Sequence, residues 1–80
     1  MHAADRSDAY LAQRSKLDKS VLTRILDAES KVLRVPELGK PLSNELSGLF
    51  SEHIGRWRII YTYDDSTVYF LHCRKRKEGY

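Results

Sequence analysis

Basic residues recur on two stretches late in the sequence, in a pattern suited to holding the phosphodiester of a nucleic acid. A guanidinium presents a planar fork of donors that matches phosphate oxygens. Cleavage of RNA at a ribose 2′-hydroxyl would need a base for the hydroxyl proton, cations that stabilise the phosphorane, and an acid for the leaving 5′ oxygen. Lys, His or Tyr could act as base or acid, and Arg as the charge stabiliser. The positions concerned are Arg56, Arg58, His72, Arg74 and Arg76.

The run Arg74-Lys75-Arg76-Lys77 is unbroken and basic, in a chain whose net charge is +3. It is either a solvated chain end or a positively charged segment that binds phosphate groups. Basic strands are common, so the pattern by itself is also consistent with basic residues that are solvated or structural and have no chemical role.

Other kinds of site find little support in the sequence. The single cysteine, Cys73, excludes an intramolecular disulfide and a zinc site built on several thiolates, and we interpret it as a small strand residue. His53 and His72 do not form a convincing metal set with the scattered acids. The glycines are scattered, so no glycine-rich phosphate loop is present. We therefore expect neither a metal nor a cofactor.

The spacing of apolar residues predicts the elements that position these side chains. Residues 5–16 are consistent with a short amphipathic helix. After Asp18, a residue type that caps helices, apolar residues recur every three or four positions and predict a helix over 19–34. The short joint between them predicts an antiparallel helical hairpin. Pro36 ends the second helix.

After a loop at 37–41 the apolar period changes from 3.6 to 2. Strands are expected at 49–54, 56–63 and 67–73, with a turn at 64–66. This order predicts an α+β fold, in which an N-terminal antiparallel helical hairpin packs on a small antiparallel β-sheet.

A turn of three residues would pair residue 63 with residue 67, so that residues of equal parity share a face. One face would then carry Trp57, Ile59, Tyr61, Tyr69 and Leu71, and the other Arg56, Arg58, Phe70, His72, Arg74 and Arg76. We expect the helices to pack on the first face through Val21, Ile25, Val32, Trp57, Ile59 and Leu71.

The composition limits the class of protein. Of 80 residues, 41% are hydrophobic and 31% charged, as in a globular domain. No apolar run approaches the ~20 residues that cross a bilayer, and no charged-then-apolar leader opens the chain. We expect a single domain over residues 1–80, in the cytoplasm and away from membranes.

Several segments carry a likeness to a known family. They are "GKPL", "LSGLFS", "RWRIIY" and "CRKRKEGY", preceded by "LDKSVLTRIL" and "VPELG". Their order and spacing over residues 17–80 resemble the RelE/ParE superfamily of toxins from toxin–antitoxin systems. The likeness is strongest to the RelE and YoeB branches, whose members are messenger-RNA endonucleases acting in the ribosomal A site.

The resemblance implies a role for each matching residue. Arg58 falls on the arginine of the family's strand motif, a phosphate-contacting and charge-stabilising position. His53 falls on a basic position of the preceding strand, where Lys or Arg is commoner.

The closing motif allows two alignments. The RelE form places Arg76 and Tyr80 on the catalytic Arg and Tyr, with Lys75 at the usual His position. The YoeB form favours Arg74 instead, and we rank Arg76 slightly first because Tyr80 follows it by four residues. The candidate set comprises catalytic Arg58, Arg76, Tyr80, Lys75 and Arg74, with RNA-binding His53, Arg56 and Lys77.

The sequence departs from the family pattern in two places. Members usually begin with a β-strand before the first helix, whereas residues 1–10 show no strand pattern, so we expect that edge strand to be missing. No carboxylate occupies the YoeB general-base position, since Glu37 precedes "GKPL". The catalytic set is therefore RelE-like, with basic residues and a tyrosine.

The resemblance thus implies a metal-independent, ribosome-dependent messenger-RNA interferase. Its partners would be the ribosome, mRNA and a cognate antitoxin that covers the basic surface or displaces a terminal element. Two alternatives share the fold. One is a ParE-like gyrase inhibitor, against which the closing Arg, Lys and Tyr residues argue. The other is an inactive protein that only binds antitoxin. The absence of the first strand would favour this alternative.

Overall fold

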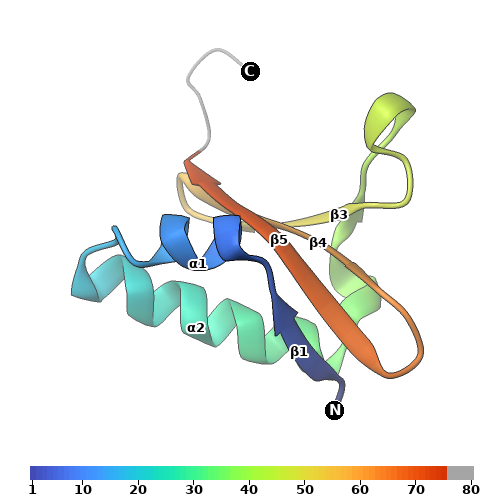
Figure 1. The fold of residues 1–80 in the computed structure, drawn as a ribbon, viewed down its shortest axis with the longest axis horizontal. Coiled ribbons are helices and arrows are strands. Elements are labelled where there is room, and N and C mark those ends of the chain that lie inside the picture. Colours follow the sequence, from blue (N-terminus) through green and yellow to red (C-terminus); the bar gives the residue numbers. More distant parts are fainter. Residues whose placement is uncertain (76–80) are drawn as a thin grey trace.

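The computed structural model describes residues 1–75, which form two α-helices and a five-stranded mixed sheet (Figure 1). The predicted α+β class is confirmed. The strands lie in the order β1-β5-β4-β3-β2, with β1 parallel to β5 and the other neighbours antiparallel. The elements are β1 Ala3–Arg6, α1 Asp8–Arg14, α2 Lys19–Arg34, β2 Lys40–Pro41, β3 Phe50–Ile54, β4 Trp57–Tyr63 and β5 Thr67–Lys75, with 3-10 turns at Pro36–Leu38 and Asn44–Leu46.

Helix α2 begins and ends where the sequence predicts. The Asp18 carboxylate accepts a hydrogen bond from the Val21 amide at 3.0 Å. This bond satisfies one of the amide groups that the first helical turn leaves free. The helix stops short of Pro36, which lacks the amide hydrogen that a further turn would need.

Strand β1 is a correction to the sequence prediction, which expected no strand before the first helix. Residues Ala3–Arg6 pair in parallel with β5. Most of this strand is exposed and lacks apolar alternation, so the sequence pattern does not show it. Backbone pairing with β5 and an ion pair between Arg6 and Glu29 hold it in place. Consequently α1 starts at Asp8, after the Ser7 cap, and is shorter than predicted.

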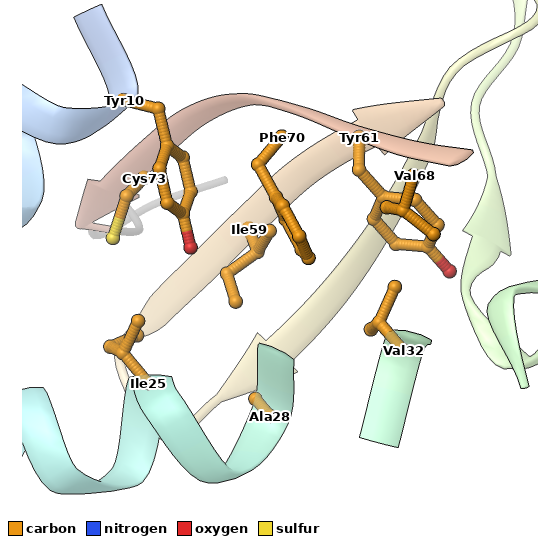
Figure 2. Close-up of a cluster of buried hydrophobic side chains, with 9 residues drawn as sticks. All are labelled: Tyr10, Ile25, Ala28, Val32, Ile59, Tyr61, Val68, Phe70 and Cys73. Carbon is orange, nitrogen blue, oxygen red and sulfur yellow. The ribbon is translucent and has the colours of Figure 1, made fainter. Parts of the chain in front are cut away.

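Both helices pack on one face of the sheet, and the core lies between the two layers (Figure 2). The predicted contacts of Ile25, Val32 and Ile59 are confirmed as buried, with Val21 and Trp57 partly buried at the margin. The buried cluster consists of Tyr10, Ile25, Ala28, Val32, Ile59, Tyr61, Val68, Phe70 and Cys73.

The turn between β4 and β5 differs from the predicted one. Tyr63 pairs with Val68 rather than with residue 67, so the parity near the turn is the reverse of that expected. Phe70 therefore lies in the core, although the prediction placed it on the basic face. Tyr69, predicted to be in the core, lies outside the buried cluster.

A β-bulge further along β5 restores the predicted parity. The register shifts between Tyr61 and Ile60 of β4. Leu71 is the additional residue on β5, since Tyr61 pairs with Phe70 and Ile60 pairs with His72. Beyond it, Ile60 pairs with His72 and Arg58 with Arg74, as equal parity requires. Leu71, predicted to pack under the helices, lies outside the core cluster for the same reason.

A buried carboxylate joins β1 and both helices. Glu29 is 2% exposed and accepts hydrogen bonds from Arg6 at 2.6 Å, Arg14 at 2.9 Å and the Tyr10 hydroxyl at 2.7 Å. Burial, together with the hydrogen bond to Glu29, raises the pKa of Tyr10. Two guanidiniums and a phenol thus compensate a charge that would be costly to bury alone.

Candidate functional site

The sheet face opposite the helices carries the basic strand residues. Side chains alternate along a strand, so the register assigns each one to a face. Because Ile59 and Tyr61 point into the core, their neighbours on β4 point the other way. We call this the open face. One row across it holds Lys40, Ser51, Ile60 and His72, and the next row holds His53, Arg58 and Arg74.

The cations of the open face lack acidic partners within residues 1–75. The three ion pairs in this part of the chain use Arg6, Arg14 and Lys31. Arg58 and Arg74 are direct cross-strand neighbours. Like charges placed opposite each other destabilise a sheet. The face therefore holds a concentration of positive charge that the described residues leave uncompensated.

Buried polar atoms without a partner also gather on this face. Three side-chain atoms in the described chain are buried and lack a hydrogen bond: Ser51 Oγ, Arg58 Nε and His72 Nδ1. Ser51 and His72 flank Ile60 in one row, and Arg58 lies in the adjacent row. Folded proteins satisfy nearly all buried polar groups, so such a cluster of exceptions is typical of a site that a ligand completes.

His72 is held toward its neutral form. Burial lowers the pKa of its imidazole, and the positive charge of Arg74 lowers it further. A neutral imidazole has one nitrogen free to accept a proton. The open face thus places a potential base among fixed cations.

The remaining sequence candidates lie in different places. Arg56 is exposed in the turn between β3 and β4, at the end of the open face. Lys75 pairs with Trp57, which puts it on the helix side of the sheet and away from Arg74. Arg76, Lys77 and Tyr80 lie outside the described residues.

Two members of the open face, Lys40 and Ser51, were not among the candidates. Strand β2 is too short to show an alternation, so no sequence signal places Lys40 beside Ser51. The loop before it is anchored by the Tyr61 hydroxyl, which donates a hydrogen bond to the Pro36 carbonyl at 2.5 Å. A side chain at Gly39 would collide with this phenol. Burial raises the pKa of Tyr61 to about 12, so it remains a donor.

Chemically, the open face suits a polyanion. Two opposed guanidiniums can bind the oxygens of one phosphate, and His72 in the adjacent row can exchange a proton. Within residues 1–75, no three His, Cys, Asp or Glu side chains lie where they could hold a metal ion. In the same part of the chain, neither helix is long and apolar enough to cross a membrane.

The sequence matches a family model described as the ParE toxin of the type II toxin–antitoxin system parDE, over residues 3–80. A curated relative, Toxin RelE of Mycobacterium tuberculosis, is 42% identical over 45 residues, which make up 54% of this chain and 46% of that protein. The match thus spans less than half of the length of that relative.

Solved structures of toxins share the fold, including the two that follow. The toxin–antitoxin complex RelBE2 of Mycobacterium tuberculosis superposes with a TM-score of 0.84 at 30% identity, covering 94% of this chain and 98% of that chain. The intact RelBE toxin–antitoxin complex of E. coli gives 0.82 at 18% identity, covering 98% and 100%. At the latter identity the likeness is one of fold alone.

Proposed function

Because this chain belongs to the ParE toxin family of type II toxin–antitoxin systems, we propose that it is a ribosome-dependent endonuclease of messenger RNA. The chain is a toxin of the RelE/ParE kind. The observation that carries the proposal is the opposed pair Arg58 and Arg74, without acidic partners in residues 1–75 and flanked by unpartnered buried polar atoms.

In this proposal, Arg58 and Arg74 hold the scissile phosphate and stabilise the charge that develops on the phosphorane. The attacking group is the ribose 2′-hydroxyl, so the reaction requires proton transfers and cations. His53 and Arg56, at the same end of the open face, bind neighbouring phosphates.

The closing motif supplies the other proposed residues. Tyr80 stacks on a base or exchanges a proton, while Lys75, Arg76 and Lys77 add positive charge near the substrate. Between the two possible catalytic arginines of this motif, the register favours Arg74, because it lies directly opposite Arg58. Arg76 then contributes to binding.

The proposed partners follow from the same charge pattern. Ribosome and mRNA bind through their phosphates, and a cognate antitoxin neutralises the toxin by covering the open face. The similar solved structures are complexes of a toxin with an antitoxin, which supports this partner. The proposed location is the cytoplasm, where ribosomes are found.

The second candidate function is that of a ParE-like inhibitor of DNA gyrase, which we retain because the matching family model is described as the ParE toxin. The opposed arginines and His72 favour RNA chemistry over it, since an inhibitor of gyrase needs no proton acceptor. The alternative of an inactive antitoxin-binding protein depended on the expected absence of the first strand. Because β1 is present, that reason for inactivity no longer applies.

Induced expression in a bacterial host tests the proposal. The parent should arrest growth, with messenger RNA cut within codons and plasmid supercoiling unchanged. Arg58→Ala should relieve the arrest, whereas Lys16→Ala, in the exposed joint between the helices, should not. Arrest with relaxed plasmid and intact mRNA would favour gyrase and contradict the proposal.

A further inference from the structure

The bulge at Leu71 decides which way His72 faces. Near the turn, β4 and β5 pair so that Tyr61 lies opposite Phe70. If this register continued, His72 would lie opposite Ile59 and point into the core. The additional residue instead pairs His72 with Ile60, on the open face. Bulges beside active sites commonly re-aim a side chain in this way.

The re-aimed imidazole lies on the same face as the other unpartnered groups. His72 Nδ1 is buried without a hydrogen bond, as are Ser51 Oγ in the same row and Arg58 Nε in the next. Diagonal neighbours on adjacent strands are roughly 7–8 Å apart. A phosphate held between Arg58 and Arg74 would therefore place its own ribose within reach of His72.

The groups that face His72 keep it a base. The nearby charges on the open face are cationic: Arg74 on β5, Arg58 on β4 and Lys40 on β2, with the His53 imidazole on β3. The nearest carboxylate that the register places on this face is Asp5 of β1, beside Tyr69 and toward the other end of β5. Burial and Arg74 lower the pKa of His72 from 6.5, so the imidazole is neutral at pH 7.

We propose that His72 is a catalytic residue that accepts the proton of the ribose 2′-hydroxyl, an assignment that rests on the proposed endonuclease function. The freed 2′ oxygen attacks phosphorus and forms the new P–O bond of a 2′,3′-cyclic phosphate. The P–O5′ bond breaks, and the leaving 5′ oxygen takes a proton from solvent water. The imidazolium of His72 then returns its proton to solvent, which restores the base.

The test is single-turnover cleavage of mRNA in the A site of purified ribosomes, at saturating toxin. His72→Gln should lower the cleavage rate by roughly 10²–10⁴-fold, the usual contribution of a general base. The toxin concentration at half-saturation should not change. His2→Gln is the matched control, because that histidine lies at the opposite end of the chain and contacts Asp64 and Tyr63 instead.

Two further readouts separate proton transfer from a structural role. The parent rate should fall at acid pH with a midpoint below 6.5, and His72→Gln should lose that dependence. Added imidazole should restore part of the rate of His72→Ala, which a packing defect would not allow.

The outcomes distinguish this assignment from the proposed function. If the parent cleaves mRNA, but His72→Gln cleaves equally fast with the same pH profile, the role of His72 is wrong and the endonuclease function stands. Loss of activity without rescue by imidazole would also overturn the proton-acceptor role. If the parent does not cleave mRNA on ribosomes, the proposed function fails and this assignment fails with it.

Discussion

Arg58 and Arg74 lie directly opposite each other on β4 and β5, on the face of the sheet that the helices leave open. Neither guanidinium forms an ion pair within residues 1–75. Opposed like charges lower the stability of a sheet. Under the proposed function, an anionic ligand that bridges the two strands would remove that cost.

Replacing one of these arginines should separate stability from toxicity. Arg74→Gln removes the opposed charge and should raise the free energy of unfolding by about 0.2–1 kcal/mol, while growth arrest is lost. Urea denaturation measures the first effect and induced expression the second. Lys16→Gln removes an equal charge at an exposed site and should change neither. A destabilised Arg74→Gln would show that this arginine supports the fold instead.

The Glu29 network should contribute strongly to stability. Glu29→Ala leaves the buried Tyr10 hydroxyl and the partly exposed Arg6 and Arg14 without their acceptor, and should cost about 1–3 kcal/mol. Glu52→Ala, which breaks the pair with the half-exposed Lys31, should cost at most about 1 kcal/mol. Similar losses for the two variants in urea denaturation would contradict a special role for the buried carboxylate in joining β1 to the helices.

The buried apolar face of α2 allows the packing of the core to be tested. Ile25 is fully buried and its neighbour Leu26 is 42% exposed. Ile25→Ala should lower the free energy of unfolding by about 2–5 kcal/mol, and Leu26→Ala by roughly 0.5 kcal/mol or less. Thermal and urea unfolding of the two variants would show this contrast. Equal effects would contradict the assigned helix face.

Binding to ribosomes should depend on salt. If phosphates are the ligand, affinity should fall steeply between about 50 and 200 mM salt, because bound counterions are released. Arg58→Ala should reduce the slope of log affinity against log salt by about 1. Fluorescence anisotropy of labelled toxin measures both, and Lys16→Ala serves as the control. An affinity that does not change with salt would exclude phosphate contacts as its source.

Helix α2 and the two faces of β4 could be predicted because their signals are local. The period of 3.6 and the Asp18 cap define α2, and the alternation from Trp57 to Tyr63 defines the buried face of β4. Arg58 and Arg74 could be grouped by strand parity, and His53 was identified through the family resemblance. The structure places the three residues in one row.

The missed features depend on contacts between distant segments. β1 has no apolar alternation, and its formation depends on β5 and on the Arg6–Glu29 pair. The bulge at Leu71 results from how the two strands meet, and no residue type marks it. Lys40 joins the open face through its pairing with Ser51, and Tyr61 anchors the loop that precedes it.

The most direct test of the account is the cleavage of mRNA on purified ribosomes with a defined codon in the A site. The parent should cut the message within that codon and leave free mRNA intact. Arg58→Ala and Arg74→Ala should each reduce the cleavage rate at least about 100-fold, with Lys16→Ala equal to the parent. A parent that leaves ribosome-bound mRNA uncut, or an Arg58→Ala variant as fast as the parent, would contradict the account.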